Sequence, residues 1–248
     1  MTSPRAPVPT LDAGLPVRAF FTTRDGGVSA APFDSLNPAR HVGDAGEAVE
    51  ANRLRIAGLA HAPVAYMSQV HGDVVARVHG ADERPEADGM ITDTSGLALA
   101  VLVADCVPVL LHHASTGAVA AVHAGRQGVT KKVVERAVAA LAAPGSGRTE
   151  GITAAIGPAI CGACYEVPDQ MREEVAHVEP AAFATTSWGT PALDLRAAVE
   201  AQLRAAGVER FHRVGGCTRE DPHLYSHRRD GVTGRFAGVI RCEIDPRL

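Results

Sequence analysis

The stretch that decides the fold is Leu97-Ala-Leu-Ala-Val-Leu-Val-Ala-Asp105-Cys106-Val-Pro108-Val-Leu-Leu111. Its 15 residues are too few for a membrane helix, which needs roughly 20 apolar residues, and Asp105 and Pro108 interrupt them. Short apolar runs that are bounded by polar residues or proline are typical of strands in a sheet. The stretch therefore predicts two strands, at 97–104 and 107–111, with Asp105 and Cys106 where one stops and the next starts.

Similar runs flank this stretch on both sides. The sequence predicts further strands at 17–23, 65–70, 74–78, 118–122 and 152–156. Apolar residues at helical spacing predict helices at 46–60, 129–143, about 168–178 and 194–206, the last with Asp194 as its N-cap. Strands in runs with helices inserted between them indicate an α+β fold with mixed sheets. Neither a GxGxxG nor a Walker A motif occurs, which argues against a dinucleotide-binding Rossmann domain or a P-loop enzyme.

The size and composition narrow the class of protein. The chain has 248 residues, 46% of them hydrophobic, and a net charge of −4. No Ser/Gly-rich linker divides it, so a single domain over 1–248 is expected, and the charge gives no reason to expect a nucleic-acid partner. No membrane association is expected either. Residues 1–14 lack the plan of a secretory signal and are expected to form a loose leader. Five cysteines, an odd number without an export signal, favour reduced thiols in the cytoplasm.

Three potential metal ligands lie at the ends of strand-like runs. They are His71 in Gln-Val-His-Gly, Cys106 in Ala-Asp-Cys-Val-Pro and His123 in Val-His-Ala-Gly. Two imidazoles and one thiolate suit zinc, and strand ends can aim them at one point. Three ligands without an obvious fourth favour a catalytic site, which keeps one position open, over a structural site. The alternative is that both histidines and the cysteine are ordinary buried residues.

The remaining cysteines and histidines give weaker signals. Cys161-Gly-Ala-Cys164 has the spacing of a redox or zinc pair, but the sequence has no second such pair and Gly-Pro precedes it, so a structural role is favoured. His112 and His113 are neighbours in a strand and face opposite sides, so they are not expected to bind one ion. The others are expected to face solvent: His41, His61, His79, His177 and His212.

Ordered motifs along nearly the whole chain resemble one family. They are Phe21-Thr-Thr-Arg24-Asp-Gly-Gly-Val-Ser, Ser35-Leu-Asn37, His41-Val-Gly-Asp44, Gln69-Val-His71-Gly, Ala87-Asp88-Gly-Met-Ile-Thr92, Ala104-Asp105-Cys106-Val-Pro, Val122-His123-Ala-Gly, Ile156-Gly-Pro, Cys164-Tyr-Glu-Val, Asp194-Leu and Ser226-His-Arg228-Arg229-Asp-Gly-Val-Thr-Gly-Arg235. The chain thereby resembles the bacterial laccase-domain proteins (multicopper polyphenol oxidase-like, YfiH-type). These are regarded as purine nucleoside phosphorylases with adenosine deaminase activity.

The resemblance implies both a fold and a site. It implies two mixed sheets packed against each other and flanked by helices, in α/β/β/α layers, with a small-molecule site beside a catalytic zinc. His71, Cys106 and His123 match the family's zinc ligands, which agrees with the ligand set proposed from the strand ends. Two departures are visible: Arg126 stands where the family usually has Trp after His-Ala-Gly, and His227 where an aromatic residue usually precedes the arginine pair. The first puts substrate preference in doubt.

The implied reaction has purine nucleosides and phosphate as substrates. Adenosine, inosine, guanosine or S-methyl-5′-thioadenosine would give a free base and ribose 1-phosphate, and zinc would also activate water for the deamination of adenosine. Arginines bind phosphate in fork geometry, so Arg24, Arg228 and Arg229 are the phosphate candidates. Arg24 and Arg229 rank above Arg235, which could equally be structural and hold a carboxylate such as Asp230. The full set of expected substrate contacts is Arg24, Asn37, Gln69, Asp105, Arg228 and Arg229.

Three other functions stay open at this point. Cys106 could be a thiolate nucleophile, with His71 or His123 as its base, in a hydrolase that edits peptidoglycan precursors. A copper-dependent phenol oxidase fits less well, because the several His-x-His pairs of a multicopper cluster are missing from the sequence. The third alternative is a non-enzymatic binding domain that zinc stabilises. In such a domain the open coordination position would have no function. The protein is expected to be a monomer or a weak homo-oligomer.

Overall fold

Two mixed β-sheets form the centre of the molecule. The computed structural model describes residues 8–142 and 149–243. The first sheet has the order β1-β2-β13-β6-β3 and the second the order β12-β9-β7-β8-β5-β4. Their strands are β1 (Thr10–Asp12), β2 (Ala19–Thr22), β3 (Val64–Tyr66), β6 (Ala98–Val103), β13 (Phe236–Arg241), β4 (Val75–Arg77), β5 (Gly89–Thr92), β7 (Val107–His113), β8 (Val119–Ala124), β9 (Ile152–Ile156) and β12 (Arg210–Arg213).

Helices and a small hairpin complete the fold. The helices are α1 (Gly46–Ala60), α2 (Arg126–Thr130), α3 (Val133–Ala142), α4 (Asp169–Val178), the 3₁₀ turn η1 (Pro180–Ala182), α5 (Leu195–Ala205) and α6 (His227–Asp230). Strands β10 (Phe183–Thr185) and β11 (Pro191–Leu193) pair as a separate antiparallel ribbon. Asp194 caps α5 as expected, since its side chain accepts a hydrogen bond from the amide of Ala197.

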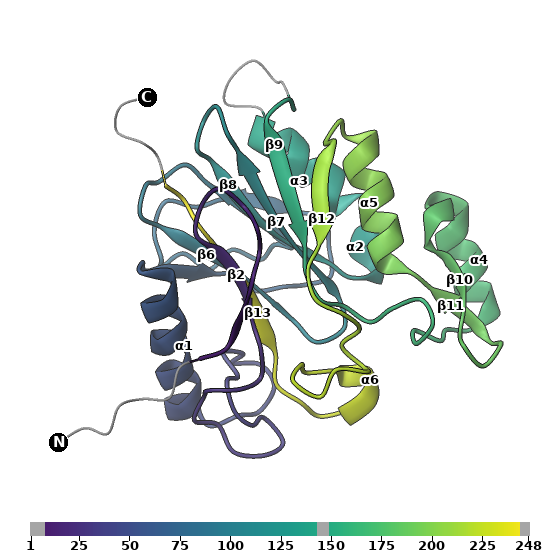
Figure 1. Cartoon of the computed structure of the whole chain (residues 1–248), viewed down its shortest axis with the longest axis horizontal. Helices are drawn as coiled ribbons and strands as arrows, with labels where there is room; N and C mark the ends of the chain where they lie inside the picture. Colours follow the sequence, from purple (N-terminus) through teal and green to yellow (C-terminus); the bar gives the residue numbers. More distant parts are fainter. Residues whose placement is uncertain (1–7, 143–148, 244–248) are drawn as a thin grey trace.

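The two sheets pack face to face, and helices cover their outer faces. Phe21, Val101, Leu110 and Phe236 belong to the core between the sheets. Helix α1 packs on the outer face of the first sheet, and α3 and α5 pack on the outer face of the second. Figure 1 shows these layers, with α1 on one side of the molecule and α3 and α5 on the other. The expected α+β fold, with two packed mixed sheets flanked by helices, is confirmed.

Burial on both faces explains the long apolar stretch. In β7, Leu110 faces the first sheet, whereas Val109 and Leu111 face the helices. In β6, Val101 faces the second sheet and Leu102 faces α1. Successive side chains of a strand point to opposite faces, so a strand covered on both sides is apolar at every position. The stretch 97–111 therefore forms two strands of different sheets, joined at Asp105 and Cys106.

Several elements differ from those expected. The leader prediction for 1–14 is wrong at Thr10–Asp12, which pair with β2 as β1, while residues 1–7 lie outside the described part. The helix expected at 129–143 is two helices, because Lys132 has a left-handed backbone (φ 64°) between α2 and α3; residue 143 lies outside the described residues. The strand expected at 65–70 ends at Tyr66. Strands β5, β10, β11, β12 and β13 were not expected.

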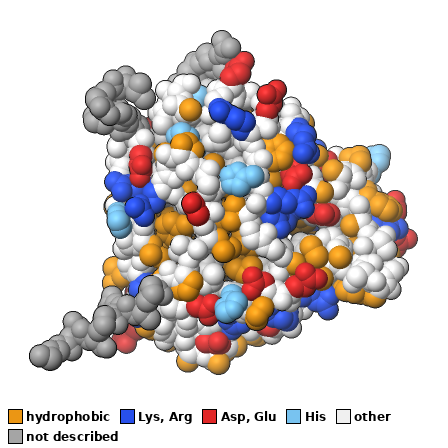
Figure 2. Space-filling view, viewed as in Figure 1, with side chains coloured by type: hydrophobic (Ala, Val, Ile, Leu, Met, Phe, Trp, Pro, Cys, Tyr) orange, Lys and Arg blue, Asp and Glu red, His pale blue; other side chains and the backbone are white. Residues whose placement is uncertain are grey.

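Charges of both signs are interspersed on the surface. On the face seen in Figure 2, the described Lys and Arg side chains alternate with Asp and Glu, so this face has no field of one sign. Among the described residues, no helix has both the length and the apolar character that crossing a membrane would require.

Candidate metal centre

The three expected ligands converge on one point. The ligand atoms of His71, Cys106 and His123 all lie within 4.8 Å of one another. The two imidazole rings are 4.7 Å apart between centroids and meet edge to face at 75°. His123 is buried, Cys106 half-buried and His71 exposed, so the cluster opens to solvent on the His71 side. This donor set fits a metal ion that accepts nitrogen and sulfur ligands, with one side accessible.

The sheet positions two of the ligands, and a loop positions the third. Cys106 comes directly before β7, and His123 lies in β8 opposite Pro108 in the antiparallel register. His71 lies in the loop after β3, five residues beyond Tyr66, and has a left-handed backbone (φ 57°). Cys106 and His123 thus lie at strand ends, as expected. His71 does not, and its position depends on another residue.

That residue is Asp88, which was not expected to have a role at the site. Its fully buried carboxylate accepts hydrogen bonds from the backbone amides of Val70 (3.3 Å), His71 (3.0 Å) and Gly72 (2.6 Å). The same carboxylate is 2.7 Å from Nδ1 of His123. Asp88 therefore holds two of the three ligands together, one by its backbone and one by its ring. A carboxylate behind a metal-binding histidine fixes the ring orientation and tautomer.

The contact with Asp88 also fixes the protonation of His123. A carboxylate only accepts hydrogen bonds, so Nδ1 carries the proton and Nε2 is left for a metal. In the metal-free protein burial opposes the imidazolium, but Cys106 and Asp88 outweigh it and raise the pKa of His123 to about 9. Burial also acts on Asp88, yet the hydrogen bonds from His123 and Gly72 leave the pKa of Asp88 below its usual value. The pair is thus ionised when no metal is bound.

Gly125 leaves the space for an ion. A Cβ atom at this position would lie 2.9 Å from Nδ1 of His71, 3.1 Å from Sγ of Cys106 and 3.5 Å from Cε1 of His123. The backbone of Gly125 has φ −79°, which any residue adopts. The reason for glycine is therefore space alone, because a side chain here would fill the gap between the three ligands.

Asp105 lies directly before Cys106 and is held from two sides. Its carboxylate accepts a hydrogen bond from the Thr218 hydroxyl (2.6 Å) and another from the Arg228 backbone amide (2.6 Å). Its backbone is left-handed (φ 99°), a conformation that costs free energy in a residue other than glycine. The structure thus brings Asp105 to the metal cluster, with both carboxylate oxygens bound to residues of the C-terminal part of the chain.

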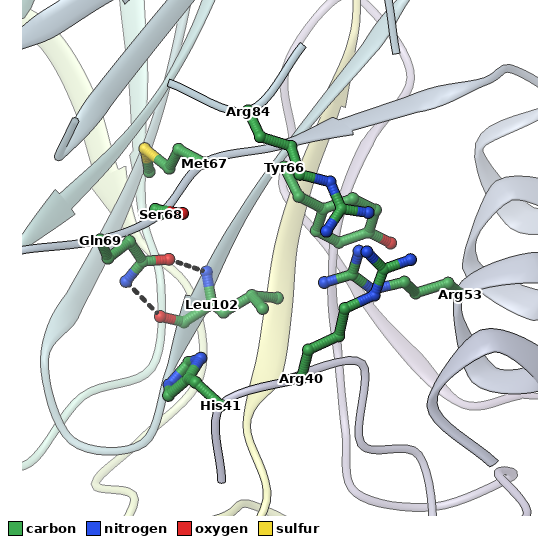
Figure 3. A pocket seen from close by; sticks show the side chains of 9 residues that line it. All are labelled: Arg40, His41, Arg53, Tyr66, Met67, Ser68, Gln69, Arg84 and Leu102. Carbon is green, nitrogen blue, oxygen red and sulfur yellow. Dashed lines mark hydrogen bonds between the residues drawn. The ribbon is translucent and has the colours of Figure 1, made fainter. Parts of the chain in front are cut away.

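Two other expected contact residues have structural partners. The Gln69 side chain bonds both the amide (2.9 Å) and the carbonyl (2.8 Å) of Leu102, which fastens the His71 loop to β6 (Figure 3). Asn37 is fully buried; its amide donates to Asp44 (2.8 Å) and its oxygen accepts from the Arg235 backbone amide (3.0 Å). Both residues position neighbours of the cluster, and their contact with a substrate stays a prediction.

The three expected phosphate-binding arginines differ in what they already bind. The Arg24 guanidinium donates to the backbone and carboxylate of Asp34. All three guanidinium nitrogens of Arg229 donate, to Asp230 and to backbone carbonyls at 218, 219, 221 and 224. Within the described residues, only Nη1 of the exposed Arg228 guanidinium has a hydrogen-bond partner, the Glu166 carbonyl, and the group lies over the ring of Tyr165. Arg228 therefore has the most donors available for a ligand.

Two further arginines act on the cluster electrostatically. Burial first, and then His123, lowers the pKa of His71 despite the opposing charge of Asp88, and the positive charges of Arg235 and Arg126 add to the lowering. Burial also lowers the pKa of Arg235, while negative charge on Cys106 and Asp105 opposes that shift. The departure at Arg126 thus places a cation beside the ligands. The sequence ranked Arg235 below Arg24 and Arg229 for phosphate binding, and that ranking stays a prediction.

A cationic pocket of about 250 Å³ lies beside the His71 loop. Gln69 is part of its wall, and the guanidinium groups of Arg40, Arg53 and Arg84 gather around Tyr66 (Figure 3). The Arg53 guanidinium lies 4.0 Å from the centroid of the Tyr66 ring. Among the described residues, the buried Tyr66 hydroxyl has no hydrogen-bond partner. Three cations and an unpaired hydroxyl make this pocket suited to a polar or anionic group.

The exposed and paired histidines agree with the sequence analysis. His41, His61, His79, His177 and His212 are exposed. His112 and His113 are buried in β7, and within the described part of the chain neither belongs to a group of potential metal ligands.

Known proteins are similar to this chain over nearly its whole length. The family model described as multi-copper polyphenol oxidoreductase laccase matches residues 18–243. A protein of Streptomyces coelicolor named purine nucleoside phosphorylase is 51% identical over 226 residues, 89% of this chain and 93% of its own length. A Mycobacterium tuberculosis protein with the same name is 47% identical over 239 residues, 94% of this chain and 95% of its own.

Solved structures agree with these sequence matches. The crystal structure of YlmD from Geobacillus stearothermophilus has a TM-score of 0.87 and 34% identity, and the match covers 98% of each chain. A Neisseria meningitidis protein has a TM-score of 0.86 and 36% identity over 96% of this chain and 99% of its own. The protein therefore belongs to the laccase-like family that the model of the multi-copper polyphenol oxidoreductase laccases describes.

Proposed function

We propose that this protein is a zinc-dependent purine nucleoside phosphorylase that also deaminates adenosine. The observation that carries the proposal is the convergence of His71, Cys106 and His123, in a chain whose relatives at 47 and 51% identity bear the phosphorylase name. One thiolate and two imidazoles favour zinc over a multicopper centre, for which this single group supplies too few histidines. His71, Cys106 and His123 would hold the ion, and zinc would act there as a Lewis acid that stabilises developing negative charge.

The cations around the cluster suit phosphate. Phosphorolysis forms a bond from a phosphate oxygen to C1′ of the ribose and breaks the bond from C1′ to the purine nitrogen, whose electron pair leaves with the base. The phosphate must therefore be held beside the sugar. We assign this role to Arg228, whose guanidinium is exposed and half free, supported by the charges of Arg126 and Arg235. Arg24 and Arg229 follow, because both are already bound within the protein.

The anionic groups have positioning roles. Asp88 keeps the proton of His123 on Nδ1 and holds the His71 loop, so both imidazoles stay in place during turnover. Asp105 fixes the backbone of Arg228 beside the cluster. The cationic pocket lined by Arg40, Arg53 and Arg84 raises the local concentration of anions near the His71 loop. The substrates we expect are adenosine, inosine, guanosine and S-methyl-5′-thioadenosine.

Product analysis tests the proposal. Protein of known zinc content is given each nucleoside with and without phosphate, and the products are identified by mass spectrometry. Free base with ribose 1-phosphate, formed only with phosphate and lost in Cys106→Ala together with the zinc ion of this cluster, is the expected result. Cys242→Ser is the matched control, since Cys242 is a buried thiol bonded to the Gly117 carbonyl and is not one of the three ligands. Intact nucleosides at full zinc occupancy would refute the assignment.

One observation favours a second candidate. The charge of Cys106 raises the pKa of His123, as a thiolate raises that of an adjacent imidazolium in cysteine hydrolases. In that case Cys106 would be the nucleophile of a hydrolase acting on amide bonds of peptidoglycan precursors. Alkylation of Cys106 by iodoacetamide distinguishes the two candidate functions. If Cys106 is a zinc ligand, it reacts only after the zinc has been removed by a chelator. If it is a free nucleophile, it reacts without a chelator, and adding a metal slows the reaction.

A further inference from the structure

A second cluster of potential ligands lies where two separate turns meet. The ligand atoms of Cys161, Cys164, Cys217 and Glu220 all lie within 4.8 Å of one another. The sequence indicated only the Cys161 and Cys164 pair, because the other two residues are more than 50 positions away and include a carboxylate. The fold supplies the second pair, since Cys217 forms a parallel β-bridge with Ala159.

The two turns have the same spacing and the same backbone. Cys161-x-x-Cys164 and Cys217-x-x-Glu220 each place two donors three positions apart. In the first turn the amide of Cys164 bonds the Cys161 carbonyl (2.9 Å), and in the second the amide of Glu220 bonds the Cys217 carbonyl (3.2 Å). The next residue of each turn donates to the same carbonyl. Paired turns with this donor spacing are the usual frame of a structural zinc site with four protein ligands.

Two hydrogen bonds already hold members of the cluster together. The Cys164 thiol donates to the Glu220 carboxylate (3.4 Å), so a proton lies between two groups that bind metals when deprotonated. The Cys161 amide donates to Sγ of Cys217 (3.4 Å), so this contact joins the first turn to the second. Sulfur atoms bound to one tetrahedral zinc lie about 3.8 Å apart, because each bond is about 2.3 Å long. The observed grouping needs little movement to reach that geometry.

Burial argues against a redox role for these thiols. Cys164 and Cys217 are buried, and they pack with Ile160 in a small apolar cluster. A buried thiol is poorly accessible to the small thiols and oxidants that take part in disulfide exchange. A divalent cation, in contrast, is held by neighbouring cysteines as thiolates.

We infer that Cys161, Cys164, Cys217 and Glu220 form a second, structural zinc site that is closed by four protein ligands. It fastens the loop after β9 to the segment between β12 and α6. That segment contains Thr218, whose hydroxyl holds Asp105 next to the first cluster. Because protein ligands take all four positions, the second site has no open position for a substrate. Its function is to hold in place the loops behind the first cluster.

Zinc counts in matched variants test this inference. Each protein is reduced, loaded with Zn²⁺, desalted and measured by mass spectrometry of the metal. We expect two zinc ions per chain in the wild type, one in Cys106→Ala, one in Cys164→Ser and two in the Cys242→Ser control. One ion in the wild type, and none in Cys106→Ala, would overturn the inference. So would an intact-mass measurement of the air-purified protein that finds a disulfide among these cysteines and no second zinc.

Two measurements keep the test decisive if Cys164→Ser does not fold. Glu220 is exposed, so Glu220→Gln is expected to fold and to weaken zinc binding at the second site by at least about tenfold, measured against a chelator. Unchanged affinity in Glu220→Gln would remove Glu220 from the site. With Co²⁺ in place of zinc, Cys106→Ala should keep about three quarters of the thiolate charge-transfer absorption of the wild type, because three of the four proposed thiolate ligands remain. Its absence in Cys106→Ala refutes the second site.

Discussion

The two ligand clusters differ in how they are closed. The first has three donors, two of them imidazoles, and opens to solvent at His71. The second has four donors, three of them thiols, contributed by two turns of the same geometry. In the first a buried carboxylate, Asp88, lies behind the ligands, whereas in the second the carboxylate of Glu220 is itself a donor.

This difference indicates that the first cluster has a catalytic role and the second a structural role. A metal with three protein ligands keeps a position for water or substrate, and its ligands need outside support to stay in place. A metal with four protein ligands has no such position, and the ion itself supplies the rigidity. We therefore expect changes near the first cluster to affect activity more than stability, except at His123, whose ring is paired with the buried Asp88 carboxylate. Changes to the four ligands of the second cluster should affect stability more than activity.

The largest effect that would test this comparison is expected for Gly125→Ala. The new Cβ would lie within about 3 Å of two ligand atoms, so zinc should be lost from the first cluster alone. Phosphorolysis should fall about a thousandfold, because a Lewis-acid metal contributes several kcal/mol to transition-state stabilisation. Zinc content and kcat/KM are measured beside Gly58→Ala, where a Cβ meets nothing within 4 Å. Full activity in Gly125→Ala would mean that the reaction does not use this metal.

The next largest effect concerns the two histidines of the first cluster. His123→Ala leaves the buried Asp88 carboxylate without its charged partner, so the chelated protein should lose about 3 kcal/mol of unfolding free energy. His71→Ala, at an exposed position, should cost the metal but little stability. Urea unfolding of both variants without metal gives the comparison, and adding Asp88→Asn to His123→Ala should restore part of the loss. Equal destabilisation by both histidine variants would contradict this account of Asp88.

A change of pH is expected to affect the unfolding free energy less than His123→Ala does. Deprotonation removes the charge of His123, but its neutral ring keeps the hydrogen bond to Asp88. The pKa of His123 is raised to about 9 in the metal-free protein. The stability that the imidazolium contributes is therefore fully present below the usual histidine pKa of about 6.5 and is lost as pH rises through about 9. Unfolding free energies of chelated wild type and His123→Asn should converge between these values. A difference that grows with pH would show that His123 is neutral in the native protein.

The smallest effect links the two clusters. Thr218→Val removes the hydroxyl that donates to Asp105, at a cost of about 1.5 kcal/mol for a bond to a charged group. Thr218→Ser keeps the hydroxyl and is the control. Both proteins should retain two zinc ions, and kcat should fall only in Thr218→Val, because Asp105 also holds the Arg228 amide. If both variants lose the second zinc, Thr218 acts through the turn itself rather than through Asp105.

The sequence predicted the layers well and the connections less well. Strands such as β6 and β7 are apolar on both faces, so their pattern is unambiguous. The strand β13 was missed because Gly238 interrupts its pattern; a Cβ there would lie 2.9 Å from the Phe21 ring, so close sheet packing requires the glycine. The break between α2 and α3 depends on the backbone of Lys132, which no periodicity reveals.

The sites follow the same division. His71, Cys106 and His123 were predicted because each is a metal-binding residue type near an apolar run. Asp88 was missed because its role depends on four hydrogen bonds to residues 16 to 35 positions away. The second cluster was missed because its two halves meet only through the pairing of Ala159 with Cys217. The sequence shows which residue types are present, whereas tertiary contacts decide which of them lie close together in space.

The position of β13 has a consequence for biosynthesis. This strand pairs with β2 on one side and β6 on the other, so the first sheet stays split until residues 236–241 have left the ribosome. Until then β2 and β6 each present an unpaired edge, and such edges invite aggregation. The two halves of the first sheet therefore stay separate in the nascent chain until β13 is available to join them. A chaperone that shields β2 and β6 would act before that point.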